Sequence, residues 1–265
     1  MPTLTLVSLL AESARPLFRA VAAYLTEHAG VPARLLEGVP WPEQERMLDA
    51  GAADGGFLCG LLYSHKRAWL EPLAAPVMRG ARYAGRPIYF SDVVVPRASP
   101  FERFAELRGA RWLFNDRGSF SGYALLRAHL AALGETGAFC GPLRASGGHM
   151  RSLEMLAAGQ ADAAAVDSTV LDLARVQQPE LVARLRVVAT LGPNTMPPAV
   201  AARHVPPELR ERLRDALLAM HRHPAGRAAL AAGLAERFAP VHDRDYDAIR
   251  ATAERAEAVW LEHAE

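Results

Sequence analysis

Lysine is almost missing from this 265-residue chain. Lys66 is the only lysine, so nearly all basic residues are arginines, and the formal net charge is only +1. The arginines are scattered along the chain and do not gather in one segment. We therefore expect neither a nucleic-acid partner nor membrane insertion. Nucleic-acid binding needs clustered basic residues, and membrane insertion needs a long apolar segment.

Cysteine is also scarce. Cys59 and Cys140 stand far apart, without C-x-x-C or Cys/His ligand spacing, so we expect no disulfide framework, no metal site and no cofactor. No uncharged apolar run reaches the roughly 20 residues that span a bilayer. The first residues, MPTLTLVSLLAES, lack the basic and apolar regions of a secretion signal. This predicts a cytoplasmic protein as written, or a periplasmic one if a leader has been removed.

An internal echo is the most informative feature that is present. Residues 47–54 (MLDAGAAD) recur as 155–162 (MLAAGQAD) with six of eight positions identical. In both copies the pattern predicts a helix that ends with a glycine at the C′ position, and an acidic residue then leads into a buried strand. A chance match between alanine-rich segments is the alternative.

The echo extends upstream, because a strand, a loop and a helix precede each copy. Residues 4–9 and a helix over about 13–28 match residues 111–114 and a helix over about 122–133. Strands that alternate with helices predict parallel-rich sheets covered by helices. We therefore expect an α/β fold.

The middle and end of the chain suggest where two lobes divide. Residues 87–96 predict a long strand, and Ser99, with Pro100 and Glu102, fits the start of a helix with a capping box. Residues 185–191 are expected to be the last clear strand, before an irregular segment and a mainly helical end from Pro206. The predicted lobes are 1–93 plus 194–265, and 94–193, joined near 92–97 and 190–198 with a ligand cleft between them.

The segment from Asn115 to Tyr123 (NDRGSFSGY) leaves a strand and opens a helix whose expected apolar stripe is Tyr123, Leu126, Leu130 and Leu133. A helix start offers unpaired N–H groups and the positive end of the dipole, and Ser119 and Ser121 add hydroxyls. These groups could hold an oxyanion. Simple N-capping by either serine is the equal alternative.

A second candidate segment is residues 146–149 (SGGH), which precedes a short helix ending at Gly159. Glycines let the backbone approach a ligand, and His149 could donate to an anion or change charge near neutral pH. A surface or capping histidine is the alternative.

Catalytic motifs are weak. No Walker loop, H-E-x-x-H, G-x-G-x-x-G or G-x-S-x-G occurs, so no catalytic residue is assigned. Lys66 beside His65 could form a Schiff base. We expect instead a solvated helix lysine.

Taken together, these motifs resemble the phosphate/phosphite/phosphonate substrate-binding family, which has the two-lobed type 2 periplasmic-binding-protein fold with a hinge. The segments that carry the resemblance are the Ser-x-Ser-Gly helix start, the Gly-His loop, and the glycine and Asp-containing strand that follow. The resemblance covers nearly the whole chain. It implies ligand-binding roles for Ser119, Phe120, Ser121, Gly122, His149 and Asp167 in the second lobe, and for Tyr89, Ser91, Trp41 and Tyr63 in the first.

The resemblance implies a solute-binding protein that closes over a small anion, as part of an ABC transporter with a membrane component or as its cytoplasmic relative. Two residues or segments depart from the family pattern and bear on the identity of the ligand. Phe120 replaces a frequent threonine, which suggests a less polar or larger ligand, and residues 194–198 offer no acidic side chain for an aminophosphonate. An enzyme of the same fold, either a lyase or a pyrimidine-synthase-like protein, and a ligand sensor are the alternatives.

Overall fold

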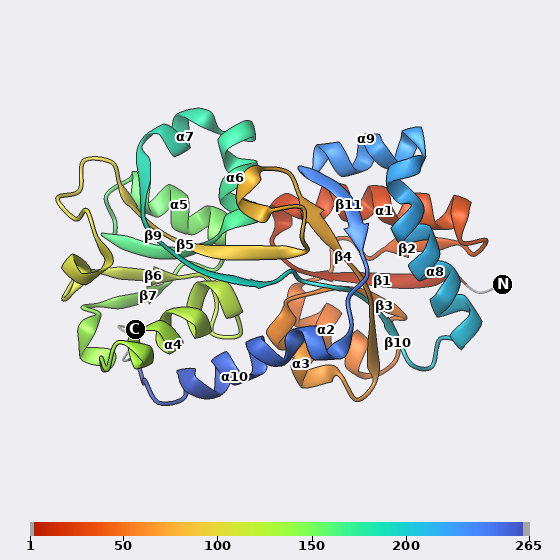
Figure 1. Cartoon of the computed structure of the whole chain (residues 1–265), viewed down its shortest axis with the longest axis horizontal. Helices are drawn as coiled ribbons and strands as arrows, with labels where there is room; N and C mark the ends of the chain where they lie inside the picture. Colours follow the sequence, from red (N-terminus) through yellow and green to blue (C-terminus); the bar gives the residue numbers. More distant parts are fainter. Residues whose placement is uncertain (1–2, 262–265) are drawn as a thin grey trace. The chain divides into compact units, whose positions relative to one another are not determined.

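The computed structural model describes residues 3–261, which form two compact units (Figure 1). Unit 1 comprises the described residues up to Ile88 and Thr195–Asp247. Unit 2 comprises Tyr89–Asn194 and the described residues from Ala248 on. These limits differ from the predicted lobes at residues 89–93 and at the C-terminal helix, and the lobe division stays a prediction.

Unit 1 has a six-stranded mixed sheet. Its strand order is β11 (Ala235–Ala239), β4 (Leu70–Met78), β10 (Ala199–Ala202), β3 (Gly55–Leu58), β1 (Leu4–Leu9) and β2 (Ala33–Leu35). Strand β1 is parallel to β2 and β3, whereas β10 is antiparallel to β3 and β4. Every residue of β1 is buried, as expected for a central parallel strand.

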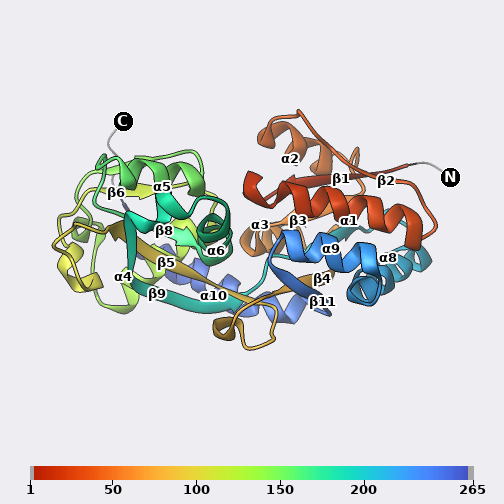
Figure 2. The same ribbon diagram turned by 90° about the horizontal axis from the view of Figure 1, so that it is seen from above.

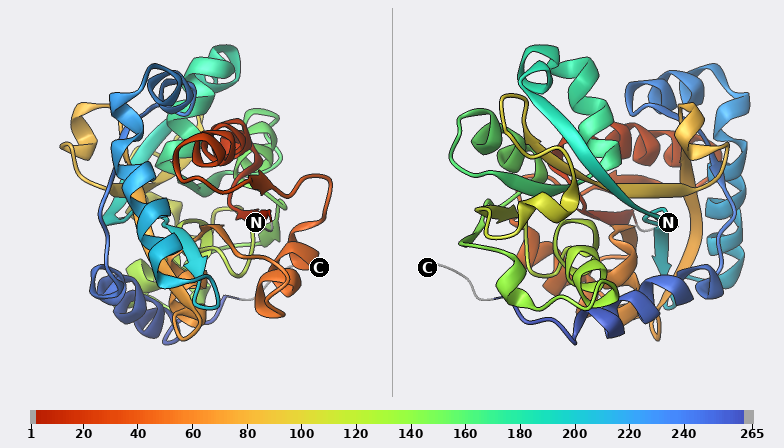
Figure 3. Two further views of the ribbon diagram at one scale, coloured as in Figure 1. Left: turned by 90° about the vertical axis from the view of Figure 1, so that its right-hand side faces the viewer. Right: turned by 60° about the vertical axis from the view of Figure 1, so that its left-hand side comes forward.

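Helices of unit 1 cover this sheet. They are α1 (Arg15–His28), α2 (Trp41–Asp49), α3 (Gly60–Lys66), α8 (Pro207–Ala219) and α9 (Pro224–Ala232). Helices α8 and α9, in blue, pack beside α1, in red (Figures 2 and 3), while α2 contacts β1.

Unit 2 has a five-stranded mixed sheet. Its order is β7 (Leu143–Ala145), β6 (Trp112–Phe114), β8 (Ala163–Asp167), β5 (Ile88–Pro96) and β9 (Leu185–Thr195). Strand β6 is parallel to β7 and β8, and β5 is antiparallel to β8. The right panel of Figure 3 shows β9 beside β5, at the edge of the sheet.

The helices of unit 2 are α4 (Leu125–Ala132), α5 (His149–Ala157), α6 (Ser168–Gln177), α7 (Pro179–Ala183) and most of α10 (Asp247–Ala256). Helices α5, α6 and α7 contact one another, and side chains from α5 and α6 share a buried apolar core with Val94, Leu113 and Val166. Among the described residues, no helix is long and apolar enough to cross a membrane.

The internal echo forms the same local structure twice, which confirms the prediction. Gly51 and Gly159 lie just after α2 and α5 with φ of 70° and 72°. The Asp54 carboxylate accepts the Thr5 N–H at 2.7 Å, and the Asp162 carboxylate accepts the Arg111 N–H at 2.8 Å. Each acidic residue therefore joins its strand to the neighbouring one.

The predicted helix start at Ser99 is wrong. A short 3-10 helix forms instead over Phe104–Leu107, because the Glu106 carboxylate accepts the N–H of Arg103 and closes the capping box there. The apolar stripe expected for the helix that begins after Ser119 also ends early, since Leu133 is exposed.

Residues 185–191 are not the last strand, because β10 and β11 follow. Both pair with β4, which the sequence reading also missed. These strands complete the sheet of unit 1 through antiparallel pairing between distant segments.

Lys66 is buried, so the expectation of a solvated lysine is wrong. Its Nζ lies 2.6 Å from Asp49 Oδ1 and 3.0 Å from Glu45 Oε1. Burial lowers the pKa of Lys66, but the hydrogen bonds to Asp49 and Glu45 outweigh it and raise the pKa above its ordinary value. The ammonium therefore joins α2 to α3 and stays charged.

Candidate functional site

The helix start after β6 is wound differently from an ordinary α-helix. Residues Phe120–Ala124 form a π-helical turn that continues directly into α4. The Ala124 N–H donates to the Ser119 carbonyl at 3.1 Å, and the Leu125 N–H donates to the Phe120 carbonyl. Single π-turns are rare and occur frequently at functional sites.

Ser119 caps this helix start. Its Oγ accepts the Gly122 N–H at 3.1 Å, so the capping interpretation is confirmed for this residue. The Ser119 hydroxyl hydrogen remains available to donate, since capping uses only the oxygen lone pair.

Ser121 and His149 meet across 28 residues of sequence. The Ser121 Oγ lies 3.3 Å from His149 Nε2, and both side chains are buried. His149 is the first residue of α5, so the start of this helix sets the position of its ring. The two sequence motifs, the Ser-x-Ser turn and the Gly-His loop, therefore meet at one place within unit 2.

Burial lowers the pKa of His149 to about 4. The imidazole is therefore neutral at pH 7, and the expectation that it changes charge near neutral pH is wrong. Its Nδ1 is buried and has no hydrogen-bond partner among the described residues. A neutral imidazole carries one N–H donor and one acceptor, and one of its two nitrogens is here left unused.

Gly122 is enclosed by two of these side chains. A Cβ added at Gly122 would lie 1.8 Å from Asn115 Oδ1 and 3.0 Å from His149 Cε1. Only glycine fits, because real Cβ atoms do not approach other atoms this closely. The absence of a side chain thus lets Asn115 and His149 pack against the helix start.

Asn115 is a polar residue that the sequence reading did not assign to the site. It follows the last residue of β6, and its Oδ1 is buried without a hydrogen-bond partner among residues 3–261. Buried polar side-chain atoms are normally paired. A polar residue directly after a strand and before a hydroxyl-rich helix start was the pattern that could have indicated it.

Ser91 and Asp167 support this helix start from the sheet. The Ser91 hydroxyl donates to the Ser121 carbonyl at 2.7 Å, and Ser91 is paired with Asp167 across β5 and β8. Asp167 caps α6, because its Oδ1 accepts from the N–H and the hydroxyl of Thr169. Burial raises the pKa of Asp167 to about 6. In this structure, Ser91 therefore holds the backbone at Ser121, and Asp167 holds the backbone at the start of α6.

The predicted aromatic residues differ in exposure. Phe120 and Tyr89 belong to unit 2 and are fully buried. Trp41 belongs to unit 1, where it is the first residue of α2 and is 36% exposed. Tyr63, also of unit 1, is buried and donates its hydroxyl to Asp243 at 2.8 Å. Its ring packs edge-on against Tyr246, so Tyr63 packs in the core of unit 1 in this structure.

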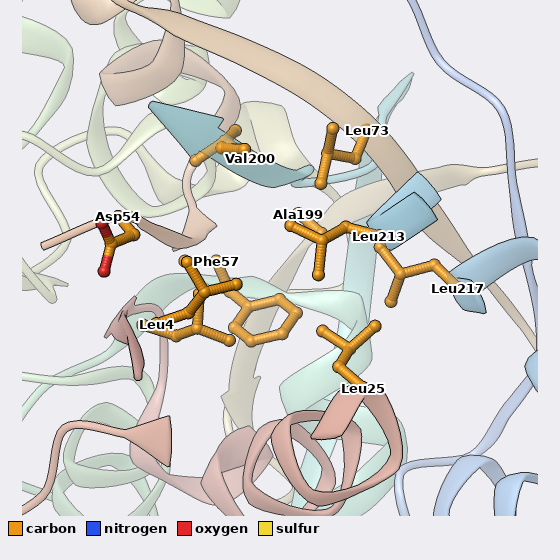
Figure 4. Close-up of a pocket in the computed structure, with 12 residues that line it drawn as sticks. Leu4, Leu25, Asp54, Phe57, Leu73, Ala199, Val200, Leu213 and Leu217 are labelled. Atoms are coloured by element: carbon orange, nitrogen blue, oxygen red, sulfur yellow. The ribbon is translucent and has the colours of Figure 1, made fainter. Parts of the chain in front are cut away.

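A small cavity inside unit 1 is not suited to an anion. Figure 4 shows its apolar lining, which includes Leu4, Leu25, Phe57, Val200 and Leu213, with Asp54 as the one charged side chain. Its volume of about 20 Å³ holds a water-sized molecule at most. Among the described residues, no group of three or more His, Cys, Asp or Glu is placed to hold a metal ion.

The buried state of His149 predicts a pH-dependent stability. The pKa of His149 in the folded protein lies below its unfolded value of 6.5. The contribution of the neutral ring to the free energy of unfolding is therefore complete above pH 6.5 and is lost as the pH falls through about 4. The full loss is about 3 kcal/mol. Urea unfolding at pH 7 and near pH 4 should show that the wild type loses more stability than His149→Gln.

Asp167 acts in the opposite direction because its pKa is raised. Its contribution to the free energy of unfolding is complete below pH 3.8 and is lost as the pH rises through about 6. Both proteins contain Asp167, so the difference between their curves isolates His149. Parallel curves for the wild type and His149→Gln would contradict the buried, neutral imidazole.

Comparison with known proteins adds a family and a fold. A family model described as the periplasmic substrate-binding protein of the phosphonate ABC transporter matches residues 8–246. A binding protein component of an ABC phosphonate transporter from Pseudomonas aeruginosa has a similar structure, with a TM-score of 0.83 and 16% identity, covering 97% of this chain and 88% of that one. PhnD1 from Prochlorococcus marinus, solved with methylphosphonate, gives 0.80 and 14%, covering 97% and 98%.

A third similar structure is the alkanesulfonate-binding protein SsuA from Xanthomonas axonopodis pv. citri, bound to MOPS. It has a TM-score of 0.62 and 20% identity and covers 98% of both chains. These solved structures are two-lobed periplasmic binding proteins, which confirms the expected fold class.

Proposed function

Because the chain belongs to the family of periplasmic substrate-binding proteins of phosphonate ABC transporters, we propose that it binds a small tetrahedral oxyanion, an organic phosphonate or a phosphate, at the start of α4 in unit 2. The family normally works in the periplasm as the substrate-binding component of an ABC transporter. We infer the same role here, with a transporter membrane component as partner.

The observation that carries this proposal is the pair of unpartnered polar atoms beside the π-helical turn. Asn115 Oδ1 and His149 Nδ1 are both buried, and both side chains face the same glycine, Gly122. Leaving a buried polar atom unpaired costs about 1–3 kcal/mol. A ligand that hydrogen-bonds to these groups would recover that cost on binding.

The available groups suit an oxyanion. In the tautomer whose Nε2 accepts from Ser121, the Nδ1–H of His149 is left to donate. The Asn115 amide presents its NH₂ when the two ends of the group are exchanged by rotation. With the helix-start amides and the Ser119 hydroxyl, these are neutral donors joined to a positive dipole end. Such a site holds an anion through hydrogen bonds without needing a lysine or arginine.

Phe120 argues for an organic substituent on the ligand. Its ring is fully buried at the second position of the Ser-x-Ser turn, where it offers no hydroxyl. A turn that offers one hydroxyl fewer suits a less polar ligand, so we infer a phosphonate with a carbon substituent rather than inorganic phosphate.

The proposed binding cycle ends with closure. The anion docks at the unit 2 donors first, and unit 1 then closes over it, with Trp41 contributing an aromatic contact, whereas Tyr89 belongs to unit 2 and is buried there. Closure follows because the ligand binds the closed state more tightly than the open one. Ser91 and Asp167 position the helix starts, and Tyr63 remains the weakest of the proposed ligand contacts because its hydroxyl is bound to Asp243.

We infer that the protein binds and releases its ligand without covalent chemistry. Lys66, the residue that could form a Schiff base, is held by Asp49 and Glu45, and its pKa is raised. A Schiff-base lysine needs a lowered pKa so that the amine is free to attack.

Ser121→Ala tests this proposal. Loss of its buried hydroxyl should weaken binding by about 1–3 kcal/mol, because the variant leaves His149 Nε2 unpaired. A thermal-shift panel of methylphosphonate, phosphate, phosphite and sulfate should identify one anion that stabilises the wild type, and the shift should fall in the variant. Ser64→Ala is the control, since it removes a buried hydroxyl that bonds within α3 of unit 1. Equal shifts in Ser121→Ala and the wild type would place the anion elsewhere.

A further inference from the structure

A second pocket lies in unit 2, with a volume of about 270 Å³. Residues of β5, α6, α7 and β9, together with the turn after β5, line it: Val94, Arg97, Leu171, Arg175, Val182, Leu185, Arg186 and Val187. All belong to unit 2. The volume is close to the lower limit of pockets that bind small organic ligands.

The second pocket is at the opposite end of the sheet from the proposed oxyanion site. Ser91, which supports the α4 start, is paired with Asp167 at the end of β8, whereas Val94 is paired with Ala164 near its beginning. Strand β9 begins where β5 ends, because the Arg97 N–H donates to the Arg184 carbonyl at 2.7 Å. The second pocket is therefore separate from the site at α4.

Its rim is strongly basic. The lining contains three arginines and no carboxylate. Arg175 is paired with Asp172, but Arg97 and Arg186 bind only carbonyls: Arg97 Nε donates to Ala183 at 2.6 Å, and Arg186 Nη2 donates to Ser99 at 2.7 Å. Neither has a carboxylate partner among the described residues, so two positive charges remain uncompensated.

The wall of the pocket is apolar. Val94, Leu171 and Leu185 belong to the buried core of unit 2, and Val182 packs against that core. Val187 lies on the edge strand β9 and is 36% exposed. An apolar floor beneath guanidinium groups matches a ligand with an apolar body and an anionic head, since guanidinium binds phosphate and carboxylate oxygens in a bidentate manner.

We propose that this arginine pocket is a second binding site for an amphiphilic organic anion, with a dianionic phosphate-type head at Arg97 and Arg186 and a small apolar body against Val182 and Val187. Two uncompensated guanidinium groups match the charge of a dianion. The inference does not depend on the proposed oxyanion site, and the experiment below separates the two.

Phenyl phosphate is the probe, titrated by calorimetry, with inorganic phosphate as the head alone and phenol as the body alone. The wild type should bind phenyl phosphate at least about 10-fold more tightly than either part. Arg97→Ala/Arg186→Ala should weaken this binding by about 10-fold or more. Arg144→Ala, which removes an exposed arginine of β7, should leave it unchanged.

Val187→Glu is a second variant that keeps both arginines, and it should weaken binding similarly because a carboxylate at the rim competes with the ligand head. Weakening in Ser121→Ala but not in the arginine variant would place phenyl phosphate at α4 and overturn the inference. So would the absence of binding at 10 millimolar probe, or equal affinities for phenyl phosphate and inorganic phosphate.

Discussion

Gly122→Ala should abolish anion binding, with an affinity loss of about 100-fold or more. The added methyl group would meet Asn115 Oδ1 at 1.8 Å, so Asn115 or the helix start must move. A displacement of about 1 Å at a site that depends on geometry costs about 100-fold. His149 would also shift, because its Cε1 lies 3.0 Å from the new atom.

Gly148→Ala is the matched control, since it is the same chemical change one residue before His149. No atom lies within 4 Å of a Cβ at Gly148, and its φ of 175° is extended backbone that alanine adopts readily. Calorimetric titration of the best anion should therefore give wild-type affinity for Gly148→Ala and none for Gly122→Ala. If both variants bound like the wild type, the site would not lie at the start of α4.

Gly55→Ala should lower the free energy of unfolding by about 3 kcal/mol. A Cβ at Gly55 would lie 2.2 Å from the Val200 carbonyl oxygen and 3.0 Å from Ala201 Cα, which are backbone atoms of β10. Backbone in the middle of a sheet cannot turn aside as a flexible side chain does. The variant therefore forces β3 and β10 apart, at the upper end of the usual cost of overpacking.

Urea unfolding measures this loss, with Gly148→Ala again as the control for replacing a glycine by alanine. The control should unfold within about 0.5 kcal/mol of the wild type, as substitutions in open positions do. A Gly55→Ala protein as stable as the control would show that the β3–β10 pairing is not as close as described.

Local patterns were predictable from the sequence because local interactions determine them. The echo around Gly51 and Gly159 predicted two equivalent helix ends, and the following acidic residues form equivalent bonds to Thr5 and Arg111. The capping role of Ser119 also follows from three adjacent residues. These features need no knowledge of distant segments.

Features that depend on distant segments were missed. Strand β10, with the sequence AVAA, is too short and too poor in β-branched residues to stand out, and it forms because β3 and β4 flank it. Lys66 ends a polar segment, yet α2 covers it with Asp49 and Glu45. Tyr63 was an open candidate for the same reason, because its partner Asp243 lies 180 residues away.

The candidate site was predicted in part. Its two motifs were identified, but the sequence could not show that Ser121 and His149 lie 3.3 Å apart or that Asn115 joins them. The expected charge switch at His149 was wrong because burial, which a loop sequence does not reveal, lowers its pKa to about 4.

The most direct test is to follow the ring nitrogens of His149 by ¹⁵N NMR while methylphosphonate is added, with His149→Gln used to assign the resonances among the nine histidines. A ligand site at His149 predicts that Nδ1 of a neutral imidazole shifts saturably as it gains a hydrogen bond to the anion, with the same dissociation constant as in calorimetry. Saturable binding that leaves the His149 nitrogens unchanged would contradict it.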